Sequence, residues 1–342
     1  MHVLRSRILR GVYEDKLPGE RALAEELGTS PVTLRVALVQ LETLGFVRRK
    51  QRSGTFVVPA AERAAETKKA FARLILPLPF VTRSDQFSVS LTIQGFQEAA
   101  GAHHVTLSLE YGDEVDDVID RAVGEASAPR CVGTCVILLP LETRHLIHLA
   151  AAATPVVVVE SYMQEMLLPC LTFDETRAGR LAAEHLVKLG HRRIALAYHE
   201  RGTRTSEERL QSVEACLHQF GLRPVVKKVV RDLDSGEELR SLLNDPASPT
   251  AAVCSSTLMG ETLAGIAGTM GRPVPRQFSV VALTGAKLDA EKNVTAVVRD
   301  HAVLGRRAFE ALLDEELMAH PSRVLVPVEL VDTGTTGPPP AD

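Results

Sequence analysis

Apolar residues near the start of the chain recur at helical spacing on both sides of a short polar break. The first run, from Leu23 to Leu27, ends just before Gly28, which suits the left-handed position that follows many helices. In the second run, Ser30 can accept a hydrogen bond as N-cap, and Pro31 already has the backbone dihedral of a first helical turn. The pattern therefore predicts a helix, a tight turn and a second helix.

The second helix, predicted from Pro31 to about Leu44, has one apolar face and one face that is free to contact another molecule. Thr33 and Arg35 flank the outward face, and Val32 and Val36 also point away from the apolar stripe. A DNA major groove suits such a face, because arginine reaches guanine acceptors, threonine bonds bases or backbone, and apolar groups contact thymine methyls. Contact with a dimer partner or with the following hairpin is the alternative. The apolar stripe consists of Leu34, Ala37, Leu38 and Leu41.

Two short strands are predicted after this helix, over Phe46–Arg49 and Thr55–Val58. The Ser53-Gly54 pair between them provides the backbone freedom that a hairpin turn needs. A basic hairpin beside an exposed helix face is well placed to neutralise phosphates, although such charge runs also occur in solvated turns. The basic residues of this hairpin are Arg48, Arg49, Lys50 and Arg52.

From Phe71 onward, apolar segments alternate with amphipathic ones, after a connector over 59–70 that is rich in alanine and charge. Strands are predicted over Arg73–Pro77, Val105–Leu109, Val132–Leu139, Val156–Glu160, Arg193–Ala197, Lys227–Arg231, Ala251–Ser255 and Val280–Leu283. Helices are predicted over Ser90–Ala100, Val115–Ala126, Glu142–Ala152, Arg177–Leu189, Ser206–Phe220, Gly236–Leu243 and Leu258–Met270. Continuous apolar strands separated by helices favour parallel sheets covered on both faces, so we expect an α/β body, and the number of strands indicates two subdomains.

Composition narrows the class of protein. The chain has 342 residues, 45% of them hydrophobic and 24% charged, which suits two or three globular domains rather than a disordered or membrane protein. No apolar run is long enough to span a bilayer and the start lacks a signal-peptide core, so we expect a cytoplasmic protein without membrane contact. The five cysteines are scattered and odd in number, which predicts reduced, buried thiols. The proline-rich segment 337–342 is predicted to be disordered.

Charge is divided unevenly along the chain. Residues 1–58 contain ten Lys/Arg and six Asp/Glu, a net charge of +4, and since the whole chain carries −4, the remainder carries −8. We therefore expect the basic start of the chain to bind DNA, while the acidic remainder repels the duplex and confines contact to the head.

One group of positions within 17–58 follows a recognisable pattern. These positions are Leu17-Pro18, Glu20-Arg21, Leu23-Ala24, Leu27-Gly28, Ser30, Thr33, Arg35, Ala37-Leu38, Leu41, Gly45 and Gly54-Thr55-Phe56-Val57. The stretch resembles the winged helix-turn-helix head of the GntR family of bacterial transcription regulators. The resemblance implies that Arg21 touches phosphate, that Thr33 and Arg35 work at the major groove, and that Gly54 brings the wing close to DNA. Val36 and Val39 replace residues that are usually polar in the family, which leaves the operator sequence open. The expected DNA-binding residues are Arg21, Ser30, Val32, Thr33, Arg35, Val36, Arg52, Ser53 and Gly54.

A second group of positions covers nearly all of residues 71–336. It includes Gln94-Gly95-Phe96, Ala99-Ala100, Pro155-Val156-Val157, Phe173-Asp174-Glu175, Gly179, Ala182-Ala183, His185-Leu186, Gly190-His191-Arg192-Arg193-Ile194-Ala195, Arg209, Ser279-Val280-Val281, Gly305, Ala308, Pro327-Val328-Glu329-Leu330 and Gly334-Thr335. This pattern resembles the effector domain of the LacI/GalR family, which is periplasmic-binding-protein-like. The resemblance implies one lobe over about 71–160 and 299–322, a second lobe over about 161–298 and 323–336, and three connecting strands. It also implies a ligand in the cleft between the lobes.

The same resemblance assigns candidate ligand-binding residues. An arginine at the position of Arg209 binds ligand oxygens in the family, whereas a surface salt bridge to Glu207 or Glu208 is the alternative for this residue. Phe87 stands where the family has an aromatic residue that stacks on the ligand, and Asp174 is expected to face the cleft or the hinge.

Two departures from the family pattern bear on the ligand. Ser256 and Thr257 replace an Asn-Asp pair, and Thr284-Gly285 stand where an acidic residue is usual. We count Ser256 and Thr284 among the ligand-binding candidates, but hydroxyl groups fork less well between sugar hydroxyls than carboxylates and amides do. The ligand is therefore expected to be less sugar-like, smaller, anionic or absent, and the loss of two negative candidates beside Arg209 favours an anion.

Signals of enzyme chemistry are missing from the sequence. There is no phosphate-binding loop and no Gly-x-Ser-x-Gly elbow. His145 and His148 share a helix face, and His185 and His191 flank a helix end, but neither pair has cysteine or carboxylate partners at the spacing of a metal site. We expect packing or surface roles for these histidines, and neither a metal nor a cofactor.

The sequence thus predicts a cytoplasmic DNA-binding transcription regulator, expected to be a repressor, that acts as a homodimer on a pseudo-palindromic operator. A winged-helix head over 1–58, a linker over 59–70 and a two-lobed sensing body over 71–336 are expected. The predicted effector is a small metabolite, either a sugar or a sugar-derived acid. Two alternatives stay open at this point: a DNA-binding head fused to an enzyme-like body, and a regulator that has lost its ligand response.

Overall fold

The computed structural model of the chain describes residues 2–43, 46–50, 53–59, 70–77, 85–124, 130–137, 141–161, 167–199, 204–286 and 294–341. Contacts divide the chain into two compact units. Unit 1 comprises Met1–Leu171 and Ala302–Val324, and unit 2 comprises Thr172–His301 and Leu325–Asp342. The chain therefore passes between the units three times. The domain and lobe boundaries drawn from the sequence stay predictions.

The start of unit 1 folds into three helices and a two-stranded hairpin. The helices are α1 (His2–Leu9), α2 (Glu20–Glu26) and α3 (Pro31–Thr43), and the strands are β1 (Val47–Lys50) and β2 (Gly54–Val57). β1 and β2 pair antiparallel with Val47 opposite Val57, one residue away from the predicted strand ends. Helical periodicity indicated the core of this head correctly, because the predicted stripe of α3 is buried. The core contains Leu4, Ile8, Tyr13, Leu17, Leu23, Ala24, Leu34, Leu38, Leu41, Phe46, Val47 and Val57.

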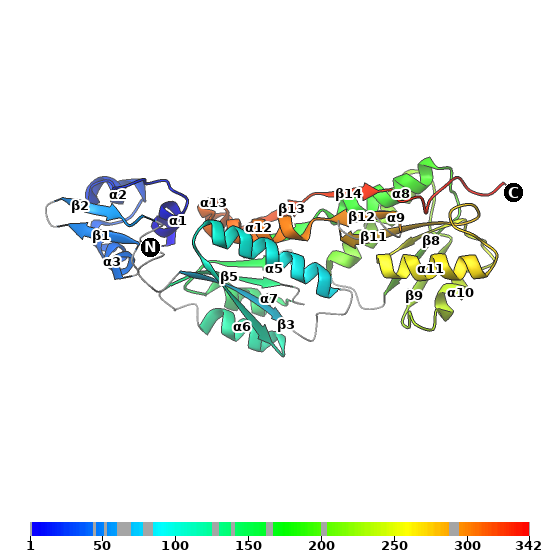
Figure 1. Cartoon of the computed structure of the whole chain (residues 1–342), viewed down its shortest axis with the longest axis horizontal. Helices are drawn as coiled ribbons and strands as arrows, with labels where there is room; N and C mark the ends of the chain where they lie inside the picture. The colour runs from blue at the N-terminus through cyan, green and yellow to red at the C-terminus, as the bar shows by residue number, and fades with distance from the viewer. Residues whose placement is uncertain are drawn as a thin grey trace. The chain divides into compact units, whose positions relative to one another are not determined.

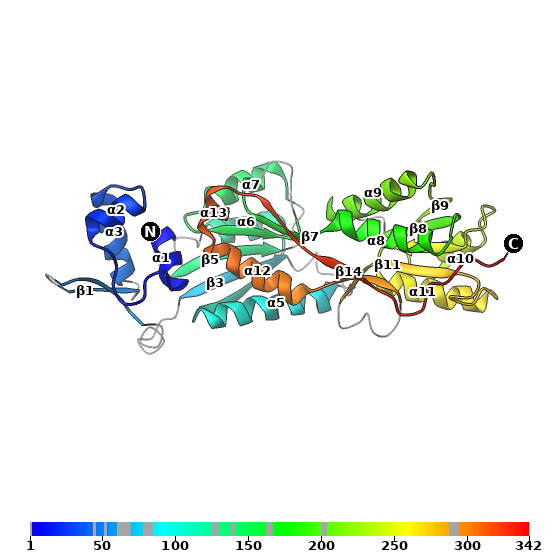
Figure 2. The same cartoon turned by 90° about the horizontal axis from the view of Figure 1, so that it is seen from above.

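A six-stranded sheet of order β13-β7-β6-β5-β3-β4 forms the rest of unit 1. Neighbouring strands in the order β4-β3-β5-β6-β7 pair parallel, as continuous apolar strands predict. The strands are β3 (Phe71–Pro77), β4 (Thr106–Gly112), β5 (Cys131–Ile137), β6 (Val156–Val159), β7 (Cys170–Phe173) and β13 (Arg323–Val326). The helices are α5 (Asp85–Ala102), α6 (Val115–Gly124), α7 (Thr143–Ala150), α12 (His301–Leu313) and α13 (Glu315–Ala319). Figures 1 and 2 show α6 and α7 on one face of this sheet and α5 and α12 on the other.

Unit 2 has a second six-stranded sheet, of order β14-β12-β11-β10-β8-β9. All its pairs are parallel except β12 with β14. The strands are β8 (Ile194–His199), β9 (Val226–Val230), β10 (Ala251–Cys254), β11 (Ser279–Ala286), β12 (Ala296–Arg299) and β14 (Val328–Val331). The helices are α8 (Glu175–Lys188), α9 (Arg204–Gln219), α10 (Glu237–Leu243) and α11 (Thr257–Thr269). Figure 2 shows α8 and α9 on one side of this sheet and α10 and α11 on the other, so each sheet is covered on both faces. The predicted α/β class with parallel sheets flanked by helices is confirmed.

The elements predicted for the body all have counterparts whose ends differ by a few residues. Strands β7, β12, β13 and β14 and helices α12 and α13 were not predicted as elements. The five cysteines are free and buried as predicted, and burial raises the pKa of each thiol. No helix in the described part of the chain is both long enough and apolar enough to cross a membrane.

The prediction of a disordered segment over 337–342 is wrong at its first residue, Gly337. Its N–H donates to Ser279 Oγ at 3.0 Å, and its carbonyl oxygen lies 2.8 Å from Nε2 of the fully buried His191. His191 Nδ1 lies 2.9 Å from Thr250 Oγ1, and burial lowers the pKa of this histidine. Composition did not predict these hydrogen bonds of Gly337, because the main-chain groups of a proline-rich segment can still bond to buried side chains. His185 Nε2 similarly lies 2.7 Å from Thr336 Oγ1, so both histidines have the predicted packing roles.

Candidate nucleic-acid interface and ligand-binding residues

The turn between α2 and α3 is built by local capping. Gly28 follows α2 with φ +59°, the left-handed conformation that the sequence predicted for it. Ser30 Oγ accepts a hydrogen bond from the Thr33 N–H at 3.1 Å and lies 2.8 Å from Thr33 Oγ1. Ser30 is therefore the N-cap of α3, as predicted, and the helix-turn-helix is fixed by residues that are close in sequence.

The outward face of α3 carries Thr33 and Arg35, and both are exposed. Arg35 Nε donates to Glu20 Oε2 at 2.8 Å, while Glu20 Oε1 lies 3.4 Å from Arg49 Nη2 on the wing. Glu20 thus links the predicted recognition helix to the wing. Its hydrogen bond also fixes the orientation of the Arg35 guanidinium, although the Arg35 side chain is 63% exposed. No sequence pattern indicated this bridge, because the three residues come from three different elements. Arg21 is also exposed, and the side chains of Val32 and Val36 lie outside the described residues.

The wing presents a row of exposed basic side chains on β1, from Arg48 to Lys50. Gly54 has φ +106°, which favours glycine, and a Cβ at this position would lie 2.8 Å from Lys16 Cε. Lys16 Nζ lies 5.4 Å and Lys50 Nζ 5.0 Å from the centroid of the Phe56 ring. Two ammonium groups therefore flank one aromatic ring at the wing. Lys16 was missed from the sequence because a single charge outside the hairpin gives no local signal. Ser53 is exposed in the turn, and Arg52 lies outside the described residues.

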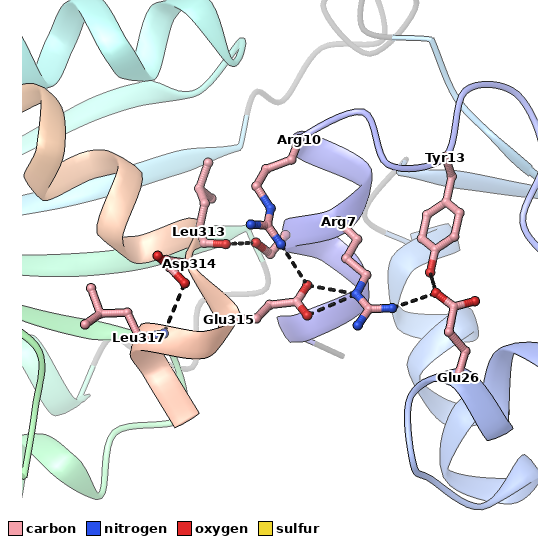
Figure 3. Close-up of polar contacts among 9 residues, drawn as sticks. Arg7, Arg10, Tyr13, Glu26, Leu313, Asp314, Glu315 and Leu317 are labelled. Carbon is pink, nitrogen blue, oxygen red and sulfur yellow. Dashed lines mark hydrogen bonds and ion pairs between the residues drawn. The ribbon is translucent and has the colours of Figure 1, made fainter. Parts of the chain in front are cut away.

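Three of the basic residues near the start of the chain face the body instead of the DNA-binding side. Arg5 Nη2 donates to the Val132 carbonyl at 2.7 Å, and Arg7 and Arg10 both pair with Glu315, as Figure 3 shows for the latter two. Part of the basic excess of residues 1–58 therefore binds the body, and only the remaining cations are available to DNA. A charge count cannot tell a cation on the binding face from one that is bound to another part of the fold.

Arg209 is buried and joins a charge cluster within unit 2. Its Nε donates to Glu175 Oε2 at 2.5 Å, and Arg299 Nη2 donates to the same carboxylate at 2.8 and 3.0 Å. The Glu175 side chain is 2% exposed, and those of both arginines are 7% exposed. The described partner of Arg209 is thus a buried carboxylate and not the surface residues Glu207 or Glu208.

An aromatic pair extends this cluster. The Arg299 guanidinium lies 5.0 Å from the Phe173 ring centroid, and the His301 ring meets Phe173 edge-on at 4.9 Å. Burial lowers the pKa of His301 to about 3, so this ring is neutral at physiological pH. Glu175, Arg299 and His301 were missed from sequence, because they are brought together only by the arrangement of α8, β12 and the start of α12.

The other predicted ligand-binding residues have local structural contacts. Asp174 is the N-cap of α8 and accepts from the Arg177 N–H at 2.8 Å, and Ser256 caps α11 through the Met259 N–H at 3.3 Å. Thr284 Oγ1 donates to the Ser255 carbonyl at 3.1 Å, which brings the two predicted hydroxyl positions to neighbouring strand ends. The side chain of Phe87 lies outside the described residues. Ligand binding by these four residues and Arg209 stays a prediction. Within the described residues, no group of three or more His, Cys, Asp or Glu could hold a metal ion.

Comparison with known proteins places both parts of the chain. Residues 1–57 match bacterial regulatory proteins of the gntR family, and residues 183–336 match the periplasmic binding protein-like domain. The chain is 26% identical to the HTH-type transcriptional regulator MalR of Streptomyces coelicolor, over 94% of this chain and 93% of that protein. It is 22% identical to the arabinose metabolism transcriptional repressor of Halalkalibacterium halodurans, over 87% of this chain and 82% of that protein.

Solved structures share the fold. The lac repressor dimer bound to operator and the anti-inducer ONPF superposes with a TM-score of 0.68 and 22% identity, covering 82% of this chain and 99% of that chain. The transcriptional regulator CelR in complex with cellobiose superposes with a TM-score of 0.66 and 20% identity, covering 93% of this chain and 100% of that chain.

The relatives matched over most of their length are transcription regulators. The helix-turn-helix with its wing and the two-sheet body agree with these matches. The chain is therefore a transcription regulator that joins a DNA-binding head matching the gntR family to a body matching the periplasmic binding protein-like domain.

Proposed function

We propose that this regulator is a cytoplasmic repressor that binds a pseudo-palindromic operator as a homodimer and releases it when a small metabolite binds the body. The observation that carries the proposal is the exposed face of α3, with Thr33 and Arg35, beside the exposed basic strand of the wing. A helix face and a basic hairpin that emerge together from one packed core suit a major groove and its flanking phosphates.

The DNA-contacting residues divide into two groups. Thr33 and Arg35 read base edges, since a guanidinium held through Nε by Glu20 still offers its Nη groups to guanine. Lys50, Lys16 and Arg48 neutralise phosphates at the wing, and Gly54 allows the turn to approach the duplex. The remaining predicted contacts are Arg21, Ser30, Val32, Val36, Arg52 and Ser53.

A homodimer follows from the physics of half-site recognition. One head covers a single half-site, and two heads related by a two-fold axis reach two half-sites about one helical turn apart. Support from a relative of the same fold is the operator-bound dimer of the lac repressor. Sedimentation of the full chain at micromolar concentration tests the dimer, and a monomer that still binds a palindrome no better than one half-site would refute it.

The effector is a sugar or a sugar-derived acid that contacts Arg209. The Nε of this arginine is held by Glu175, and its Nη groups have no partner among the described residues, so they remain available for ligand oxygens. A buried guanidinium fork favours an acidic group on the ligand, because carboxylate oxygens can pair with both Nη groups. The arabinose repressor and the cellobiose complex among the relatives support the carbohydrate class.

A thermal-shift screen of the full chain tests this assignment. The panel contains arabinose, maltose, cellobiose, the corresponding aldonic acids, and inorganic phosphate. A ligand at 100 times its Kd adds about 2.7 kcal/mol to the free energy of unfolding, so a true effector raises Tm clearly. The Arg209→Ala variant should lose this shift. A compound that shifts both proteins equally is not held by Arg209, and a panel that shifts neither refutes the proposed ligand class.

The link between ligand and operator is tested separately. Operator affinity is measured by fluorescence anisotropy with and without each compound that raises Tm. The expected decrease is about 5- to 150-fold, the range of typical allosteric couplings. Equal affinity in both conditions for every binding compound would refute ligand control of the operator.

A further inference from the structure

Helix α1 is shared between the DNA-binding head and the sheet of unit 1. Leu4 and Ile8 are 1% and 2% exposed and lie in the core of the head. Arg5 and Ser6, on the same helix, are also buried, but they bond to carbonyl oxygens of the body: Arg5 to Val132 and Ser6 to Leu313. One short helix therefore belongs to two packed surfaces, so the head cannot rotate on the body without losing buried hydrogen bonds.

Arg7 extends this contact into the helix-turn-helix itself. Its Nε donates to both oxygens of Glu315 on α13, at 3.2 and 3.0 Å, and its Nη1 donates to Glu26 Oε1 at 2.6 Å. The same Glu26 oxygen accepts from the Tyr13 hydroxyl at 2.8 Å, and burial raises the pKa of Tyr13, so it remains a donor. Figure 3 shows Arg7 between the two carboxylates, with Arg10 directed at Glu315 from the next turn of chain.

The two carboxylates that Arg7 bridges, Glu26 and Glu315, both lie at helix ends. Glu26 is the last residue of α2, directly before the turn that leads into α3. Glu315 is the first residue of α13. Helix α12 ends at Leu313, and Asp314 between the two helices caps α13 by accepting from the Leu317 N–H at 3.0 Å. The guanidinium of Arg7 thus links the first residue of α13 in the body to the last residue of α2, where the turn of the helix-turn-helix begins.

Helix α12 is suited to carry a displacement to this point. It begins at His301, where the chain passes from unit 2 to unit 1, and its 13 residues span about 20 Å. It packs on α5 without room for adjustment, since a Cβ on Gly305 would lie 1.9 Å from the Thr92 carbonyl oxygen and a Cβ on Gly95 1.9 Å from that of Ala302. Packing this close transmits strain along the helix instead of absorbing it.

We propose that Arg7 is a positioning residue of the DNA-binding head, which holds the helix-turn-helix at a fixed orientation on the body by bridging Glu315 and Glu26. The docked head is the operator-binding arrangement, because Thr33, Arg35 and the basic strand of the wing all stay exposed while Arg7 is engaged. A shift of α12 and α13 then breaks the bridge, together with the bond from Ser6 to the Leu313 carbonyl at the end of α12, and the heads of a dimer lose their common spacing. This inference rests on the proposed dimer and goes beyond it by naming the contact that sets the spacing.

The test compares the affinity of full-length protein for a palindromic operator with its affinity for a duplex that carries one half-site. The variants are Glu315→Gln and Arg7→Gln. The matched control is Glu316→Gln, which removes the same charge from the next residue of α13, where the side chain is exposed. Losing a charged hydrogen-bond pair that orders both heads should lower the palindrome-to-half-site affinity ratio about tenfold in either variant and leave it unchanged in the control.

The palindrome-to-half-site affinity ratio distinguishes a loss of head positioning from a loss of folding. A partly unfolded variant contains less active protein, which lowers the apparent affinity for both duplexes equally and leaves the ratio unchanged. A Glu315→Gln protein with the wild-type ratio overturns the inference while the proposed function stands. A wild-type protein that binds both duplexes equally refutes the dimeric operator mode, and the inference falls with it. A lowered ratio in the Glu316→Gln control as well would show a general charge effect and would also overturn the assignment to Arg7.

Discussion

Replacing Glu175 by alanine should destabilise unit 2 far more than replacing Glu184, although the two carboxylates look alike in sequence. Both lie on α8, and each pairs with two basic side chains. They differ in burial: the Glu175 side chain is 2% exposed and that of Glu184 is 25% exposed. The comparison therefore isolates the effect of burial on an ion-pair cluster.

The magnitudes follow from solvation. Without the Glu175 carboxylate, two guanidinium groups that are each 7% exposed lose the ion pair that they make with it, in a place that water reaches poorly. Removing one partner of a buried ion pair costs about 3–5 kcal/mol. Glu184 lies 3.1 Å from Lys188 and 3.7 Å from Arg180, whose side chains are 72% and 51% exposed, so its removal leaves two hydrated cations. Exposed pairs of this kind are worth about 0.2–1 kcal/mol.

Urea unfolding followed by far-UV circular dichroism measures the difference. With an m-value of about 2 kcal/mol/M, the midpoint of the affected transition should fall by roughly 1.5–2.5 M in Glu175→Ala and by less than about 0.5 M in Glu184→Ala. If Glu175→Ala does not fold, Glu175→Gln keeps the volume and should still unfold at lower urea than Glu184→Gln. Equal midpoints for the two positions would refute the reasoning that burial makes this cluster costly to break.

Three further predictions concern DNA binding and pH. Arg35→Ala should lower operator affinity by roughly 10- to 100-fold and relax selectivity at one base position, as measured by anisotropy on single-base operator variants; a uniform loss across all variants would instead indicate a phosphate contact. Lys50→Ala should weaken binding on every sequence and reduce the slope of log Kd against log salt by about 1, and an unchanged slope would remove Lys50 from the phosphate contacts. Because burial lowers the pKa of His301 to about 3, the unfolded chain binds its proton first, and the stability that the neutral ring contributes is present above about pH 6.5 and is lost as pH falls toward 3. His301→Phe should flatten the fall of Tm over this window, and an identical acid limb in both proteins would contradict the assignment.

The head illustrates how far local sequence reaches. Ser30, Pro31 and Gly28 define the ends of two helices through groups at most a few residues away, so their roles follow from residue type and spacing alone. The bridge from Glu20 to Arg35 and Arg49 spans 15 and 29 residues. Its formation depends on how α2, α3 and the wing pack together, which periodicity does not specify.

The body shows the same division at a larger scale. Alternating apolar strands and helices predicted two parallel sheets, since a strand that is buried on both faces must be apolar along its whole length. Two segments that escaped prediction, β12 and α12, lie next to a point where the chain passes between the units. Arg209 was singled out from sequence, but the carboxylate that holds it was not.

What the sequence determined by itself is the set of elements, their caps and the kind of protein they form, because hydrophobic period, glycine and proline conformations, and residue motifs act over short distances. The tertiary structure alone decided which charges meet. Glu175 and Arg299 are 124 residues apart, and Arg7 and Glu315 are 308 residues apart. A charge has many potential partners along a chain, and burial selects among them only after the order of the strands has fixed which helix ends come together.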